Sequence, residues 1–119
     1  MDIVEHLKRQ IAFSHATFGP GERRQGVIDH IMKELNDVER TGGSAGEWVD
    51  VVILALDGLW RSMRRDAPEA PNFEIAYEAA YLIAEKQDIN ERRQWPDWRS
   101  ADPDKAIEHI RVISGGGNV

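Results

Sequence analysis

The sequence predicts an all-α protein, a helical bundle of four to five helices. Apolar side chains recur at three- and four-residue spacing in long segments, and no segment alternates between apolar and polar residues as a strand would. Glycine and proline residues separate these segments. The length of 119 residues suits one domain, so we expect residues 1–119 to form a single domain with a flexible, glycine-rich tail at 114–119.

The first helix is predicted to begin after Asp2, a good N-terminal cap, and to stop at the Gly-Pro-Gly run 19–21. The second helix is predicted over residues 24–40, and a loop follows it over residues 41–44. The apolar stripes of these helices consist of Ile3, Val4, Leu7 and Ile11 in the first and of Val27, Ile31, Leu35 and Val38 in the second.

The third helix, predicted over residues 45–65, is apolar around nearly its whole circumference. Such a helix is normally buried on all sides, and in so small a protein this pattern also favours burial against a second copy of the chain. A fourth helix is predicted over residues 72–94, where a nearby proline prevents its extension. Asp102 and Pro103 predict the start of a short last helix that carries Ala106, Ile107 and Ile110.

The composition excludes several classes of function. There is no cysteine, which rules out a disulfide scaffold, a thiolate zinc site and a cysteine nucleophile. The net charge of −6 argues against binding a nucleic acid polymer, but it allows an anionic ligand whose charge is bridged by metal ions. The longest apolar run, residues 51–56, is far shorter than the about 20 residues of a transmembrane helix. Because the start of the chain also lacks the pattern of a signal peptide, we expect a cytoplasmic protein with no membrane partner.

Two pairs of acidic residues have a spacing that suits a metal site. Glu34 and Asp37 share one edge of the second helix, and Glu47 and Asp50 share a stripe of the third. Because a short loop would fold these helices antiparallel, the four carboxylates can meet and supply the hard oxygen ligands that Mg²⁺ or Mn²⁺ prefers. His30 lies on the same edge of the second helix as the first pair.

The same acidic residues can also serve purely structural roles. Asp57 continues the acidic stripe of the third helix, but it can simply pair with Arg61 at the i, i+4 spacing. Glu47 can complete a capping box with Ser44. The acids in general can form a salt-bridged, solvated face with Lys33, Arg61 or Arg64.

Three further segments carry groups that could contact a ligand. In the fourth helix, Lys86, Asn90 and Arg93 stand at i, i+4 and i+7 and can hold phosphate oxygens, although the same face can be merely solvated. Trp95 can stack on a base or close the core, and core closure is the simpler interpretation. The loop over residues 14–21, which Arg23 and Arg24 follow, contains glycines that let a ligand approach the backbone, or it only ends a helix.

Five longer blocks of sequence carry a resemblance to a known family. The blocks are Thr17-Phe18-Gly19-Pro20-Gly21, Asp29-His30-Ile31-x-Lys33-Glu34-Leu35, Glu47-Trp48-Val49-Asp50-Val51-x-x-Leu54-Ala55-Leu56-Asp57-Gly58, Lys86-x-x-x-Asn90-x-x-Arg93-x-Trp95-Pro96-Asp97-Trp98-Arg99 and Ala106-Ile107-Glu108-His109-Ile110. In this order they resemble the phage-type dATP/dGTP diphosphohydrolase (MazZ-like) family, within the MazG-like superfamily of all-α nucleoside triphosphate pyrophosphatases. The resemblance covers about residues 13–111.

The resemblance implies a metal-dependent enzyme that hydrolyses dGTP and dATP to the monophosphate and pyrophosphate. It implies that Glu34, Glu47 and Asp50 hold two or more Mg²⁺ or Mn²⁺ ions, with Asp37 in the place of a more usual second glutamate. Either Glu34 or Asp37 would be the general base. The other residues that we expect at the substrate are Lys86, Asn90 and Arg93 for the β- and γ-phosphates, His15, Thr17 and Phe18 for the purine, and Arg24, His30, Asp57 and Trp95.

The resemblance also implies a homo-oligomer, with a tetramer favoured over a dimer, and a role in shaping the nucleotide pool of a phage-infected cell. Relatives occur in phages that use 2-aminoadenine in place of adenine. The competing hypothesis is a catalytically silent helical module that binds nucleotides or a partner protein, with Trp60 and residues 51–56 as its interface. The complete set of acidic residues favours the enzyme.

Overall fold

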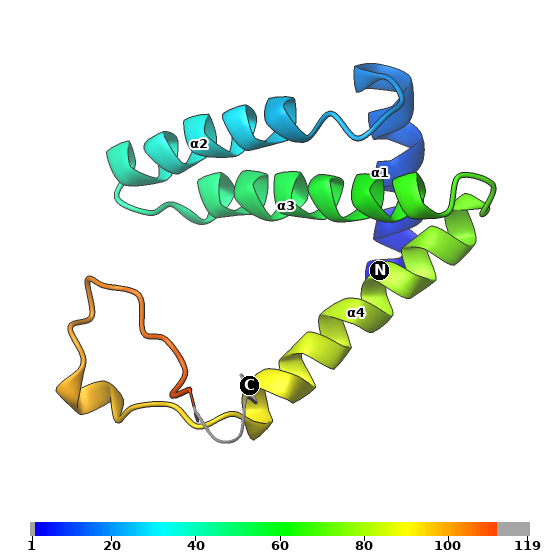
Figure 1. The fold of residues 1–119 in the computed structure, drawn as a ribbon. Helices are drawn as coiled ribbons and strands as arrows, with labels where there is room; N and C mark the ends of the chain where they lie inside the picture. Colours follow the sequence, from blue (N-terminus) through cyan, green and yellow to red (C-terminus); the bar gives the residue numbers. More distant parts are fainter. Residues whose placement is uncertain (1, 112–119) are drawn as a thin grey trace. The chain divides into compact units, whose positions relative to one another are not determined.

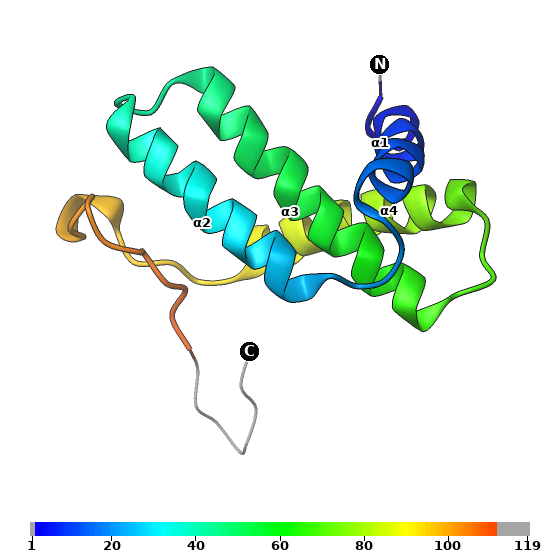
Figure 2. The ribbon, with the colours of Figure 1, turned by 90° about the horizontal axis from the view of Figure 1, so that it is seen from above.

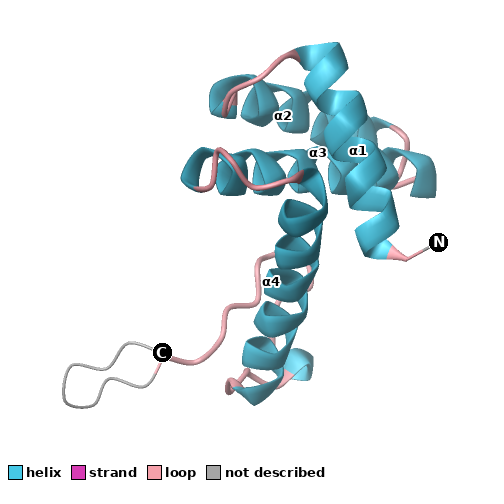
Figure 3. Ribbon diagram, turned by 90° about the vertical axis from the view of Figure 1, so that its right-hand side faces the viewer, coloured by secondary structure: helices cyan, strands magenta, loops and turns pink. Residues whose placement is uncertain are grey.

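The computed structural model describes residues 2–111, which contain four α-helices and one short 3₁₀ helix (Figure 1). The predicted flexible tail at 114–119 lies outside the described residues. Figure 3 shows only helices and loops, and the described residues include no strand, so the all-α prediction is confirmed. The elements are α1 (Ile3–Phe18), α2 (Arg24–Arg40), α3 (Ala45–Asp66), α4 (Asn72–Arg92) and η1 (Trp98–Ser100).

The ends of α1 follow the local rules that predicted them. The side chain of Asp2 accepts a hydrogen bond of 2.8 Å from the backbone N–H of Glu5, which satisfies one of the free donors of the first turn. At the other end, Gly19 has a φ of 89° and donates its N–H to the carbonyl of His15. A residue with a side chain rarely adopts this backbone conformation, so glycine ends the helix here.

Helices α2 and α3 form an antiparallel hairpin, in which they lie side by side (Figures 1 and 2). The turn between them occupies residues 41–44, as predicted, and both of its glycines have positive φ angles. The N–H of Gly43 donates to the carbonyl of Val38 at 2.8 Å and reverses the chain. Both α2 bounds agree with the prediction, α3 extends one residue further, and α4 ends two residues earlier.

The described residues form two compact units, one up to Tyr81 and one from Leu82 onward. The core lies in the first unit, where apolar side chains of three helices are almost wholly buried. Burial of these side chains is the main source of stability for the arrangement of α1, α3 and the beginning of α4. They are Leu7 and Ile11 of α1, Leu56 and Trp60 of α3, and Ile75, Ala76 and Ala79 of α4.

The expectation that α3 is buried on all sides is wrong within one chain. The core takes up side chains from the C-terminal half of α3 only. Near its N-terminal end, Trp48 is 49% exposed and Val52 is 55% exposed, and Val49 and Ile53 are also exposed. The other helices of one chain are too few to cover the whole circumference of a helix that is apolar all round. A contiguous apolar face of α3 is therefore left open to solvent.

The prediction of a short last helix after Asp102 is also wrong. The Asp102 side chain accepts from the N–H of Asp104 at 2.9 Å, and its carbonyl accepts from Lys105, so the chain turns. Beyond this turn, the described residues have no helix, and the N–H of Ile110 donates to the carbonyl of Gln94. The apolar residues of the segment, including Ile107, remain exposed. A helix this short forms only when its apolar face is packed, and that face has no packing partner in this unit.

Among the described residues, none of the helices combines the length and the apolar character that a membrane crossing requires.

Candidate metal centre

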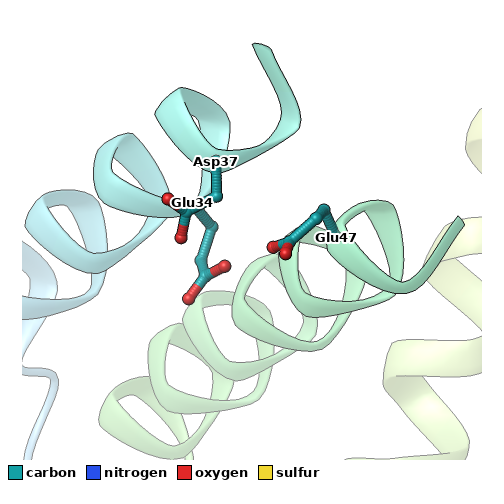
Figure 4. A group of neighbouring side chains, drawn as sticks. All are labelled: Glu34, Asp37 and Glu47. Atoms are coloured by element: carbon teal, nitrogen blue, oxygen red, sulfur yellow. The ribbon is translucent and has the colours of Figure 1, made fainter. Parts of the chain in front are cut away.

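Three carboxylates meet at the end of the α2–α3 hairpin that is closed by the turn. Glu34 and Asp37 come from α2 and Glu47 comes from α3, and each offers an oxygen atom within 4.8 Å of those of the other two. All three side chains are half-buried. Figure 4 shows that the Glu47 side chain extends toward α2, to the side on which Glu34 and Asp37 lie. The structure therefore brings together three of the four acids that the sequence predicted as metal ligands.

The local sequence explains why these side chains converge. Glu34 and Asp37 are three residues apart and so share a face of α2. The short turn then returns the chain so that the first turn of α3 lies opposite this face. Ser44 makes no side-chain cap bond to α3, so the capping box that could have occupied Glu47 is not formed. The Glu47 carboxylate is left to face α2.

The cluster has an unfavourable excess of negative charge. The pKa of Glu47 is raised above its ordinary value, first because part of its hydration is lost and then because of the nearby charges of Asp37, Glu34 and Asp50. Asp37 forms an ion pair with Arg40, whose own pKa is raised by this contact. One exposed arginine does not balance the group. A bound cation would relieve the remaining repulsion.

The chemistry of the donor set fits a hard divalent cation. Carboxylate oxygens are the ligands of Mg²⁺ and Mn²⁺, and Mg²⁺ is usually held by one or two carboxylates together with water and substrate phosphates. Glu34, Asp37 and Glu47 could hold such an ion. Asp50, the predicted fourth ligand, is exposed and lies one helical turn beyond Glu47, close enough for its charge to raise the pKa of Glu47. Its role as a ligand stays a prediction.

The cations that could have neutralised the cluster are engaged elsewhere. Lys33 forms an ion pair with Asp29 at 3.3 Å, and Arg61 forms one with Asp57 at 2.9 Å. His30, the predicted neighbour on the same edge, lies 3.5 Å from Glu34 through its Nε2 atom. The ion pairs of the cluster that the structure shows are those of Glu34 with His30 and of Asp37 with Arg40, and neither Lys33 nor Arg61 pairs with it.

Asp57 lies in a different environment from the cluster. It is 6% exposed and about 15 Å from Glu47 along the helix axis, at 1.5 Å per residue. Its oxygens accept from Trp60 Nε1 at 2.7 Å and from Arg61 Nε at 2.9 Å. Burial alone would raise the pKa of Asp57, but its bonds from Trp60, Arg61, Ser14 and Gln10 outweigh this effect and lower it. The i, i+4 pairing with Arg61 is thus present, and the predicted contact of Asp57 with substrate stays a prediction.

Asp57 has two further partners, on α1, that the sequence did not predict. Ser14 Oγ donates to Asp57 Oδ2 at 2.9 Å, and Gln10 Nε2 donates to Asp57 Oδ1 at 3.3 Å. The signal was available, because Gln10 and Ser14 are polar residues at positions that continue the apolar stripe of Leu7 and Ile11. A polar side chain on a buried stripe must find a partner, since an unpaired polar group costs free energy when it is buried.

The residues predicted to read the base, and the predicted substrate-binding residue Arg24, lie toward the other end of the hairpin from the cluster. His15, Thr17 and Phe18 are exposed in the last turn of α1, and Arg24 begins α2, where it lies 3.8 Å from a carboxylate oxygen of Glu22. Ten residues of α2 separate Arg24 from Glu34, a rise of about 15 Å. Within one chain the structure does not bring these residues to the carboxylates, and their role stays a prediction.

The predicted phosphate ligands belong to the second unit. There Asn90 Oδ1 accepts from Arg93 Nη1 at 3.2 Å, and the Asn90 carbonyl accepts from Trp95 Nε1 at 2.7 Å. The Trp95 ring contacts the ring of His109 edge-on at 5.8 Å, and Lys86 is exposed on α4. Trp95 is 44% exposed and is not part of the core, so the expectation that it closes the core is wrong. Its contact with a base, and phosphate binding by the other three residues, stay predictions.

With a hairpin of two helices that gathers three carboxylates, the chain belongs to the class of α-helical proteins that could hold a hard divalent cation. Comparison with known families identifies the group more closely. A sequence model described as dATP/dGTP pyrophosphohydrolase matches residues 6–112, and the chain belongs to this family. It is therefore a nucleoside triphosphate pyrophosphatase. No curated protein and no solved structure matches the chain.

Proposed function

We propose that this protein is a metal-dependent deoxynucleoside triphosphate pyrophosphohydrolase that converts dGTP and dATP to dGMP and dAMP with release of pyrophosphate. Its family supports the substrate class. The observation that carries the metal dependence is the cluster of Glu34, Asp37 and Glu47, whose oxygens lie within 4.8 Å of one another. These residues would hold two or more Mg²⁺ or Mn²⁺ ions, with Asp50 as a further ligand.

When bound, the metal ions would lower the pKa of a coordinated water and offset charge on the phosphates. The chain must then supply a base for the attacking water. We assign this role to Glu34, with Asp37 as the alternative, because Arg40 already donates to a carboxylate oxygen of Asp37. The Oε1 atom of Glu34 instead lies 3.5 Å from Nε2 of His30. An imidazole in this position can pass a proton on to solvent.

Lys86, Asn90 and Arg93 are the residues that would bind the β- and γ-phosphates. Lys86, Asn90 and Arg93 follow one face of α4 and the residue beyond its end. Asn90 Oδ1 accepts from Arg93 Nη1, a bond that orients the guanidinium. An oriented guanidinium can bind phosphate oxygens in a bidentate manner. This arrangement supports a role in binding the pyrophosphate that leaves.

The exposed apolar face of α3 supports a homo-oligomer. Trp48, Val49 and Val52 are about half exposed and lie on a helix whose other side is packed. Soluble proteins rarely leave such a continuous apolar face open, and a second copy of the chain would cover it. We propose a cytoplasmic homo-oligomer, with a tetramer favoured over a dimer. A role in a phage nucleotide pool, including support of 2-aminoadenine DNA, belongs to the same proposal.

The test is direct hydrolysis of each dNTP with Mg²⁺ or Mn²⁺, with the products resolved by ion-exchange chromatography. We expect dGMP or dAMP with pyrophosphate and no diphosphate. Glu47→Gln removes one charge from the cluster and should reduce kcat at least about 100-fold. Glu39→Gln is the matched control, because Glu39 is exposed on α2 outside the cluster. Consumption of no nucleotide would favour the silent module, and equal activity of the two variants would remove the metal site from the mechanism.

A further inference from the structure

A cavity lies toward the opposite end of α3 from the carboxylate cluster. It has a volume of about 310 Å³, at the low end of the range for small-molecule sites. Arg64, which lines it, follows Glu47 by 17 residues of one helix, a rise of about 25 Å. One nucleotide held by its phosphates at the carboxylates of the same chain is too short to reach this cavity. It is therefore a separate site within the first unit.

Two arginines fix the walls of this cavity in advance. Arg61 is 1% exposed, and its Nη1 donates to the carbonyls of Gly19 and Gly21, at 2.9 and 2.8 Å. This holds the loop that forms one wall. Arg64 Nη1 donates to the carbonyls of Ala67 and Ala70 and holds the turn before α4, which forms the other wall. A cavity whose loops are fixed by hydrogen bonds loses little entropy when a ligand binds.

The charge of Arg64 is not balanced by a carboxylate. All of its hydrogen-bond acceptors among the described residues are neutral oxygens: the two turn carbonyls and Asn72 Oδ1, at 2.7 Å from Nη2. Its neighbours differ, since Arg61 pairs with Asp57 and Arg65 pairs with Glu22. A guanidinium has five N–H donors, and these bonds use three of them. The Nε–H and one Nη2–H remain, a pair that can bind an oxyanion in a bidentate manner.

The other lining residues define the rest of the ligand. His15 is exposed at the cavity and can donate a further hydrogen bond to an oxyanion. Ile11 and Trp60 supply apolar surface, and a proline from each loop adds to it. None of the residues that line the cavity is acidic. We propose that this cavity binds a small organic anion, in which a compact apolar body carries one carboxylate or phosphate monoester group. The inference is independent of the proposed catalytic function.

Titration of the full chain in EDTA, followed by the indole N–H resonances in assigned NMR spectra, tests the proposal while no metal ion occupies the carboxylate cluster. The probes are phenyl phosphate, benzoate and neutral benzyl alcohol. We expect at least one of the anions to shift the Trp60 resonance saturably at millimolar concentration, with no shift of Trp98, which lies outside the cavity. The relative affinities of the two anions distinguish a phosphate site from a carboxylate site. Equal shifts with benzyl alcohol, or no shift of Trp60 with either anion, would overturn the proposal.

Substitutions then test whether the guanidinium of Arg64 binds the anion. Arg64→Gln should weaken binding of the preferred anion at least about tenfold, since it removes a charge-assisted bidentate contact. Arg65→Gln is the matched control, because it removes the adjacent charge without touching the cavity, and it should leave the affinity unchanged. If Arg64→Gln fails to fold, His15→Trp replaces it as the test. This substitution narrows the exposed side of the cavity while it retains Arg64, and it should weaken binding of the preferred anion. Equal loss in both arginine variants, or full affinity of His15→Trp, would contradict the proposal.

Discussion

Substitution of Asp57 by asparagine removes the carboxylate that, among the described residues, pairs with the fully buried guanidinium of Arg61. Arg61 is 1% exposed, and Asp57 Oδ2 accepts from its Nε at 2.9 Å. Asparagine has nearly the same size, so the change leaves no cavity. It does leave a positive charge in the interior with neutral partners only. The substitution therefore isolates the electrostatic contribution of the ion pair between Asp57 and Arg61.

The expected loss of stability follows from what remains around Arg61. Removal of one partner of a buried ion pair costs about 3–5 kcal/mol. Three neutral oxygens still accept from Arg61 Nη1 and Nη2 at 2.8–2.9 Å, those of Gly19, Gly21 and Ser14, so the lower part of this range applies. We expect the free energy of unfolding to fall by about 3 kcal/mol. That is a large share of the 5–15 kcal/mol, roughly, that stabilise a typical protein.

Urea denaturation followed by circular dichroism at pH 7 measures this loss. Asp66→Asn is the control, because Asp66 also pairs with a neighbouring arginine, Arg65, but at an exposed position. Exposed ion pairs contribute little to stability, so this control should unfold close to the wild-type urea concentration. If Asp57→Asn costs less than about 1 kcal/mol, the reasoning is refuted, because the guanidinium would then be well solvated by its neutral partners.

Three more predictions concern pH, the cap of α1 and the exposed face of α3. Because the pKa of Asp57 is lowered in the folded protein, its contribution is present above the unfolded value of about 3.9 and is lost as the pH falls through the folded pKa. The difference in urea midpoint between wild type and Asp57→Asn should thus narrow well below pH 4, and a constant difference would contradict this. Asp2→Ala removes the cap of α1 and should cost about 1 kcal/mol in thermal unfolding, whereas an unchanged melting temperature would show that the cap bond is not significant. Val52→Lys on the exposed face of α3 should lower the mass measured by light scattering while helicity is retained, and an unchanged oligomer would exclude this face as the interface.

The features that the sequence predicted well depend on local physics. Asp2 and Gly19 set the two ends of α1 through contacts within a few residues, and the structure confirms these ends. The meeting of Glu34 and Asp37 with Glu47 also required little beyond helical spacing and a short turn. Each of these predictions depends only on residues that are close together in the sequence. The sequence alone therefore contains enough information to make them.

The features that the sequence did not predict depend on distant partners. Nothing in α3 alone indicates that Leu56 is buried while Val52 is exposed, since this depends on where α1 and α4 pack. Helical spacing also places Asp50 on the same stripe as Glu47, but the position of α2 decides that Glu47, and not Asp50, lies within 4.8 Å of both Glu34 and Asp37. The failed helix after Asp102 has the same origin, because a good start signal does not form a short helix when its apolar face has nothing to pack against.

The separation in sequence of the paired residues has a consequence for the order of folding. The hairpin that carries the three carboxylates is closed by a turn of four residues, 41–44, whereas the bond from Arg61 to the Ser14 hydroxyl joins residues 47 positions apart. Short loops close at a lower entropic cost, so we expect α2 and α3 to associate before α1 docks on them. A divalent cation that binds the hairpin would then stabilise the transition state for folding, and it would accelerate refolding rather than only slow unfolding.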